Sequence, residues 1–224
     1  MSRESVVHTL RAAPLFACLD DAQIARLAES SRVRSYRKGQ LVFQYDEVGD
    51  SLAVIASGRV KVAVRSADGG ELALASLGPG DAIGELSIVD GGRRSADVES
   101  SVPTDVILIE RETVLALMKA EPALTTSVLR VIAGSMRRLT EAAADLVFLD
   151  LPRRIAKWLL EQPRDVEGRI DAVTSQEEIA HHVAGTRQSV NAALRGFERR
   201  GWVRSEGRRL IIGDVGALSR FAGL

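Results

Sequence analysis

The stretch GELSIVDGGRRSADV, residues 84–98, decides how the rest of the chain is interpreted. It lies between two runs of β-branched and apolar residues, and it combines Gly84 with the neighbours Arg94 and Ser95. A guanidinium fork, a hydroxyl and a glycine that lets the backbone approach are the groups that bind a compact anion. The stretch therefore predicts an anion site inserted in a β-rich domain. The alternative for its charged side chains is a surface ion pair beside a β-turn.

The residues around this stretch predict an antiparallel β-roll or barrel that extends from Val33 to about Arg111. Short apolar runs, several of them alternating, are separated by glycines at intervals typical of an all-β domain. Before them, residues 1–30 are expected to form short helices, one of which Asp20 or Asp21 caps, because apolar residues recur there at helical spacing.

A long helix is expected from Pro122 to Leu149. Its apolar residues form two rows at heptad spacing, which is the pattern of two helices that pack along a seam. We favour a seam between two chains over burial against the chain's own β-domain. Leu151-Pro152 then interrupts the helical pattern, and we place a hinge there. The rows are Ile132, Leu139 and Leu146, and Val128, Ser135, Ala142 and Leu149.

Residues 150–224 have the layout of a winged helix-turn-helix. A capping box, either Thr174 with Glu177 or Ser175 with Glu178, precedes a short helix at about 177–183. A turn at Ala184-Gly185 follows, and Thr186 can cap a second helix that runs to about Arg200. The sequence WVRS-EG-RRLII then has the form of a β-hairpin.

Composition and charge restrict the class of protein. The chain has 224 residues, 46% of them hydrophobic, with a formal net charge of +0. Residues 1–149 carry a charge of −3 and residues 150–224 a charge of +3, so the C-terminal part is basic and suited to phosphates. No apolar run reaches the length of a membrane helix and no signal peptide is evident, so we expect a cytoplasmic protein that does not bind membranes.

The cysteine and histidine content argues against metal and redox sites. Cys18 is the only cysteine, which excludes an intrachain disulfide, a four-cysteine zinc site and an iron–sulfur cluster. His181 and His182 are adjacent, so they face different sides of a helix and make a poor metal site. We therefore expect no metal and no haem.

The stretch at 84–98 closely resembles the phosphate-binding cassette of cyclic-nucleotide-binding domains, and the whole chain resembles the CRP/FNR family of bacterial transcription regulators. Gly-Glu-Leu followed at this spacing by Arg-Ser-Ala carries the resemblance. It implies an α+β protein with three parts: a cyclic-nucleotide-binding β-roll (residues 1–121), a dimerisation helix (122–149) and a winged helix-turn-helix (150–224). It also implies a homodimer that binds a near-palindromic double-stranded DNA site and contacts RNA polymerase.

The resemblance assigns the ligand residues. Arg94 and Ser95 would hold the cyclic phosphate, and Glu85 would accept the ribose 2'-hydroxyl. Cyclic AMP is the expected effector, although the positions that usually offer polar groups to the base hold Leu139 and Ala75 in this chain. The full expected ligand set is Gly84, Glu85, Leu86, Arg94, Ser95, Leu139 and Thr140.

The DNA-reading residues are expected at the start of the second helix of the C-terminal domain. Arginine pairs with guanine, and glutamine or asparagine pairs with adenine. By resemblance Arg187 takes the guanine-reading position, whereas Gln188 replaces the usual glutamate, which predicts a half-site related to TGTGA but changed at that base pair. The full expected set is Thr186, Arg187, Gln188, Ser189, Asn191, Arg195 and Arg208.

Two alternatives remain at this stage. The chain could be a CRP-like regulator that binds DNA without cyclic AMP or responds to another ligand. More distantly, it could be a ligand-binding interaction module that does not act on DNA. An enzyme is not expected, because the sequence shows no nucleophile–base–acid set, no HExxH motif and no P-loop.

Overall fold

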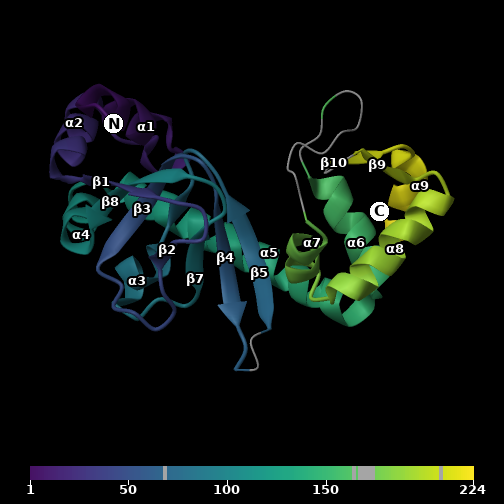
Figure 1. Ribbon diagram of the computed structural model, residues 1–224. Helices are drawn as coiled ribbons and strands as arrows, with labels where there is room; N and C mark the ends of the chain where they lie inside the picture. The colour runs from purple at the N-terminus through teal and green to yellow at the C-terminus, as the bar shows by residue number, and fades with distance from the viewer. Residues whose placement is uncertain (68–69, 163–164, 166–174, 207–208) are drawn as a thin grey trace. The chain divides into compact units, whose positions relative to one another are not determined.

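The computed structural model describes residues 1–67, 70–162, 165, 175–206 and 209–224 (Figure 1). By its contacts the chain divides into two compact units. The first consists of Met1–Arg65 with Leu74–Leu139, and the second of Ser66–Ala73 with Thr140–Leu224. Among the helices that are described, none is long and apolar enough to cross a membrane.

The first unit opens with short helices, as the sequence predicts. They are α1 (Arg3–Ala12), the 3-10 helix η1 (Pro14–Phe16) and α2 (Asp21–Ser30). The side chain of Asp20 accepts a hydrogen bond from the Gln23 amide, and the Gln23 side chain accepts one from the Asp20 amide, at 2.7 and 2.8 Å. This reciprocal capping box explains why α2 begins where it does.

Two antiparallel four-stranded sheets form the predicted roll (Figure 1). The strand order is β1-β8-β3-β6 in one sheet and β2-β7-β4-β5 in the other. Central pairs are β3 with β8, where Ala53 faces Leu108, and β4 with β7, where Val62 faces Val98. The bounds are β1 Arg32–Tyr36, β2 Leu41–Phe43, β3 Ser51–Ser57, β4 Val60–Arg65, β5 Glu71–Leu77, β6 Ala82–Ile83, β7 Asp97–Ser100 and β8 Thr104–Glu110.

Strand β3 is buried on both faces, which explains its continuous apolar sequence. Leu52 and Val54 pack with α1, α2 and their neighbours, whereas Ala53 and Ile55 pack with the core between the two sheets. Successive side chains of a strand point to opposite faces, so one strand contributes to both cores. The helices α3 (Glu85–Asp90) and α4 (Arg111–Ala120) complete this unit.

The long helix α5 runs from Pro122 to Phe148 and changes character along its length. Leu124 and Val128 are buried in the core of the first unit, so the alternative of burial within the chain holds for the first turns. Further along, its large apolar side chains are exposed, with Met136 68%, Leu146 41% and Phe148 78% exposed. The helix ends near the predicted place, but the break lies at Leu149 and Asp150, because Leu151 and Pro152 form the first turn of α6 (Leu151–Glu161). Asp150 caps α6, and its side chain accepts from the Arg153 amide.

The rest of the second unit forms the predicted helix-turn-helix and hairpin. Ser175 with Glu178 makes the capping box of α7 (Gln176–His182), and Thr174 lies outside the described residues. Phe197, Trp202 and Phe221 pack with ring centroids 5.3–5.8 Å apart in the core. The other elements are α8 (Arg187–Arg199), β9 (Val203–Glu206), β10 (Arg209–Ile212) and a terminal helix, α9 (Val215–Ala222), that the sequence analysis did not predict.

Candidate anion pocket and nucleic-acid interface

The anion stretch forms a glycine-bounded helical turn on the roll. Gly84 and Gly91, with φ of 94° and 71°, lie at the two ends of α3. Both adopt the left-handed region, where glycine is favoured because it has no Cβ. The chain then returns through Arg94 and Ser95 to strand β7, and Arg94 Nη1 lies 3.5 Å from the Gly84 carbonyl oxygen at the start of α3.

Arg94 is buried, with 4% of its side chain exposed, which rules out a surface ion pair at this position. Its Nη2 donates to the Ser51 carbonyl at 2.7 Å, and its guanidinium carbon lies 3.6 Å from the centroid of the Phe43 ring. The Asp50 carboxylate is 4.0 Å away and is itself 82% exposed. The buried Nε atom of Arg94 has no hydrogen-bond partner.

The energetics of Arg94 favour a bound anion. Burial lowers the pKa of the Arg94 guanidinium, an effect that the charges of Asp50, Glu47 and Glu85 oppose. An arginine stays charged in proteins, so this burial is a cost to the folded protein rather than a loss of the proton. An anion in contact with the guanidinium would offset that cost and could satisfy the orphaned Nε.

Gly84 makes room for the Arg94 guanidinium. A Cβ added at Gly84 would lie 2.5 Å from Arg94 Nη1, 3.1 Å from Phe43 Cε2 and 3.1 Å from the Ser51 carbonyl oxygen. No side chain fits there without displacing the guanidinium. The backbone of this turn is therefore shaped around Arg94, and the residues present fit a compact anion.

Most of the expected ligand residues line a cavity of about 320 Å³, a volume in the range of small-molecule sites. Leu139 of α5 lines the cavity. The next residue, Thr140, is exposed and does not line it. Glu85 is buried at 9% exposure, so it is not a surface residue either. The expected residues that line the cavity are Gly84, Glu85, Leu86, Arg94, Ser95 and Leu139.

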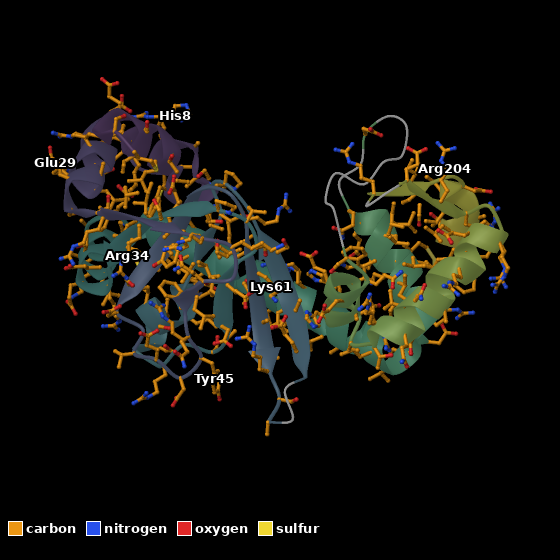
Figure 2. The ribbon with its side chains drawn as sticks, viewed as in Figure 1. His8, Glu29, Arg34, Tyr45, Lys61 and Arg204 are labelled. Carbon is orange, nitrogen blue, oxygen red and sulfur yellow. The ribbon has the colours of Figure 1, made fainter. Side chains whose placement is uncertain are left out.

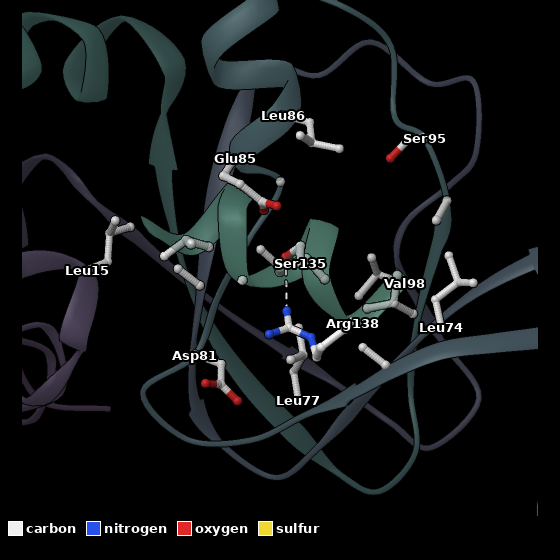
Figure 3. A pocket seen from close by; sticks show the side chains of 18 of the residues that line it. Leu15, Leu74, Leu77, Asp81, Glu85, Leu86, Ser95, Val98, Ser135 and Arg138 are labelled. Atoms are coloured by element: carbon white, nitrogen blue, oxygen red, sulfur yellow. Dashed lines mark hydrogen bonds between the residues drawn. The ribbon is translucent and has the colours of Figure 1, made fainter. Parts of the chain in front are cut away.

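The α5 wall of this cavity carries polar residues that the sequence analysis did not assign to the ligand. Arg130, Ser135 and Arg138 line it, and Figure 3 shows Arg138 with its hydrogen bond to Ser135. The spacing of Arg130, Gly134 and Arg138 by four residues places them on one helix face, which is a signal that the sequence did contain. Ala75 of β5, expected near the base, also lines the cavity.

An ion-pair network holds the strand that leaves the cassette. Arg65 of β4 donates to Asp97 and Glu99 of β7, each at 2.6 Å. The second oxygen of Asp97 accepts from the Tyr45 amide at 2.7 Å. Because Asp97 follows Ser95 by two residues, this network fixes the backbone next to the cavity.

The second unit presents an exposed helix face that is suited to DNA. Ala184, at φ 49°, makes the tight turn between α7 and α8, and the Thr186 hydroxyl accepts from the Ser189 amide at 3.2 Å. Val190, Leu194 and Phe197 of α8 are buried, which leaves the opposite face exposed. In the hairpin, Arg204 of β9 lies 3.4 Å from Glu206, and Figure 2 shows its side chain.

The expected DNA residues fall on this unit with different accessibility. Asn191 is half-buried, and its Oδ1 accepts from the Gln176 side chain at 3.4 Å. Arg208 lies outside the described residues. The exposed members of the set are Thr186, Arg187, Gln188, Ser189 and Arg195. In the part of the chain that the structure describes, no three His, Cys, Asp or Glu side chains gather as a metal site would require.

Known protein families match both the domain that holds the anion pocket and the helix-turn-helix domain. A model described as the cyclic nucleotide-binding domain matches residues 33–121, and one described as the Crp-like helix-turn-helix domain matches residues 153–221. A Mycobacterium tuberculosis protein named CRP-like cAMP-activated global transcriptional regulator is 36% identical over 219 residues, 95% of this chain and 98% of the relative. The Cyclic AMP receptor protein of Thermus thermophilus is 31% identical and is matched over 87% of this chain and 90% of its own length.

Solved structures agree on the fold. A CRP-family transcriptional regulator from Thermus thermophilus, 27% identical, superposes with a TM-score of 0.71 over 85% of this chain and 97% of that chain. A CRP/FNR-family regulator from Eubacterium rectale superposes with a TM-score of 0.79 over 96% of this chain and 100% of that chain, at 20% identity. The second likeness concerns the fold alone.

The packing around Gly84 generates a prediction that needs no ligand. Gly84→Ala should lower the free energy of unfolding by more than Gly39→Ala. Both positions have positive φ, which costs an alanine about 1–2 kcal/mol, but a Cβ at Gly39 meets nothing within 4 Å. Chemical denaturation followed by circular dichroism measures both variants. Equal losses would contradict the tight packing of Arg94 against Gly84.

Proposed function

This chain belongs to the CRP/FNR family of DNA-binding transcription regulators, which are not enzymes, and we propose that a cyclic nucleotide bound at Arg94 sets its affinity for DNA. The observation that carries the proposal is the buried Arg94 guanidinium. Its Nε atom has no hydrogen-bond partner, and its Nη1 atom lies against Gly84, where a Cβ would not fit. In this proposal the chain acts as a homodimer in the cytoplasm, binds a near-palindromic DNA site and contacts RNA polymerase.

The chemistry of the cavity supports a cyclic phosphodiester. Such a group is a monoanion, so Arg94 would supply charge and donors, and the exposed Ser95 hydroxyl would supply one more. Glu85, buried at the wall of the same cavity, would accept the ribose 2'-hydroxyl.

Cyclic AMP is the first candidate for the effector. The Mycobacterium tuberculosis and Thermus thermophilus relatives carry cyclic AMP in their names. In this chain Ala75 and Leu139, the two positions expected near the base, line the cavity with side chains that offer no hydrogen bonds. The identity of the base therefore depends on other groups of this cavity.

The exposed start of α8 supports sequence-specific DNA binding. Arg187 would read guanine through N7 and O6, and Gln188 would meet the base pair that a glutamate reads in related sites. Arg195 and Thr186 would contact phosphates, which positions the helix but does not read sequence. We propose a half-site related to TGTGA that is changed at the pair facing Gln188.

The exposed apolar side chains of α5 support a homodimer. Leu139 and Leu146 lie on the predicted heptad seam and are 47% and 41% exposed in the single chain. Apolar rows at this spacing are covered when a second helix packs against them. A second copy of α5 would cover them symmetrically, as in most homodimers.

The first prediction concerns the ligand. Arg94→Ala should weaken binding of cyclic AMP and cyclic GMP by about hundredfold or more, because several charge-assisted hydrogen bonds are lost. Arg93→Ala is the matched control, since Arg93 is 63% exposed and lies beside Asp46. Isothermal titration calorimetry of the full chain measures both.

Two outcomes would count against a cyclic-nucleotide gate. Unchanged affinity in Arg94→Ala would place the ligand elsewhere. No binding of either nucleotide by the unchanged protein, while DNA still binds, would favour the regulator that works without cyclic AMP or with another ligand.

The second prediction concerns the DNA sequence. Gln188→Glu should shift the preferred base pair at the position that residue 188 meets from adenine toward cytosine, by about tenfold or more, because an amide pairs with adenine and a carboxylate accepts from cytosine N4. Fluorescence anisotropy on duplexes that differ only at this pair measures the preference. Arg195→Ala, the control, should weaken all duplexes alike. Identical discrimination by Gln188→Glu and the unchanged protein would refute the assignment.

The third prediction concerns the dimer. Leu146→Glu should give single chains at micromolar concentration, because a carboxylate would be buried in the seam without a partner. Val147→Glu adds the same charge one residue further along, at a position that faces away from the seam, and should leave two chains together. Sedimentation equilibrium distinguishes them. A Leu146→Glu protein that remains dimeric would contradict the seam.

A further inference from the structure

The wall that α5 contributes to the cavity is basic. Its two arginine side chains, Arg130 and Arg138, offer hydrogen-bond donors and no acceptors. Arg130, Gly134 and Arg138 lie four residues apart and all line the cavity, together with Ser135. Leu139 adds an apolar side chain at the same wall. A guanidinium has five N–H donors and no acceptor, so this wall can pair only with acceptors at Arg130 and Arg138.

Arg138 is folded back along its helix. Its Nη2 donates to the Ser135 hydroxyl at 2.9 Å, as Figure 3 shows, and its Nη1 lies 3.5 Å from the position of a Cβ at Gly134. The planar guanidinium therefore lies over Gly134 and Ser135, where it forms part of the cavity wall.

Gly134 keeps this wall open. Glycine in the middle of a helix costs stability relative to alanine. The 3.5 Å distance to Arg138 is ordinary contact, so Arg138 does not require a glycine there. Because Gly134 has no side chain, it leaves space on the cavity side of α5, beside the N–H donors of Arg138.

The α5 wall lies across the cavity from the cassette. In Figure 3 the labelled Leu86 and Ser95 lie at one edge of the cavity, and Arg138 and Leu77 lie at the opposite edge. A nucleotide held by its phosphate at Arg94 and Ser95 would extend its base away from them, toward the side of the same cavity that Arg138 lines.

Resting on the proposed function, we propose that Arg138 is a specificity-determining residue that reads the base of the nucleotide, and that this pocket favours cyclic GMP over cyclic AMP. Guanine presents two acceptors, O6 and N7, which match the guanidinium fork. Adenine presents a donor, the N6 amine, in place of O6, so Arg138 can pair with N7 alone. The effector would then differ at its base from the one in the names of the relatives.

Calorimetric titration of the full chain with cyclic GMP and cyclic AMP tests this inference. The unchanged protein should bind cyclic GMP about tenfold more tightly, the lower range for a bidentate arginine–guanine pair. Arg138→Gln should invert the ratio, because an amide pairs with adenine N6 and N7. Arg138→Ala should bring the two affinities together. Arg137→Gln is the control, since Arg137 is exposed and does not line the cavity.

The outcomes separate this inference from the proposed function. Tight binding of both nucleotides with a ratio that Arg138→Gln leaves unchanged would overturn the role of Arg138 and leave the proposed function intact. Tighter binding of cyclic AMP by the unchanged protein would do the same. Absence of binding by either nucleotide would overturn both.

Discussion

The candidate site depends on one interaction, the burial of the Arg94 guanidinium against backbone carbonyls and an aromatic ring. A buried charge is costly unless its donors are satisfied, and here Nε has no partner while the closest carboxylate oxygen lies 4.0 Å away. The surrounding residues hold the guanidinium in this state: Phe43 lies against its face, Ser51 accepts from it and Gly84 leaves it room. An anion bound in contact with this guanidinium would stabilise the folded state.

The long helix α5 contributes residues to both compact units. Its earlier residues, through Leu139, belong to the first compact unit and include the cavity wall, and its later residues belong to the second unit with α8. A ligand shifts an equilibrium only by its differential affinity for the two states. In the proposed function, contacts to Ser135 and Arg138 would make the state of α5 part of the binding free energy of the effector, and this is how effector binding would be coupled to DNA binding.

Local features were predictable from the sequence because local chemistry determines them. The glycines, the caps at Asp20 and Thr186 and the break before Pro152 each follow from one or two neighbouring residues. The choice between the Thr174 and Ser175 capping boxes was not predictable, because both patterns satisfy the same sequence rule; in the structure Ser175 and Glu178 form the box. Helix α9 was missed, although Asp214 and Gly223 carry ordinary start and stop signals for it.

Much of the candidate site was predictable: the cassette residues follow from their motif, and Leu139 and Ala75, which the family resemblance pointed to, also line the cavity. The burial of Arg94 depends on Phe43 and Ser51, which are more than 40 positions away and gave no signal of their own. Arg130 and Arg138 could be placed on one helix face from their four-residue spacing with Gly134. Their position at the cavity could not be predicted, because it depends on how the roll folds against α5.

The central claim, that nucleotide binding at Arg94 and DNA binding are coupled, is tested most directly by reciprocity. The affinity for cyclic nucleotide would be measured with and without a saturating concentration of a DNA duplex that carries both half-sites. The affinity for that duplex would be measured with and without saturating nucleotide. Linkage requires the two ratios to be equal. The account predicts equal ratios of at least about fivefold, the lower range of allosteric coupling. Ratios of one in both directions, with both ligands bound, would contradict it.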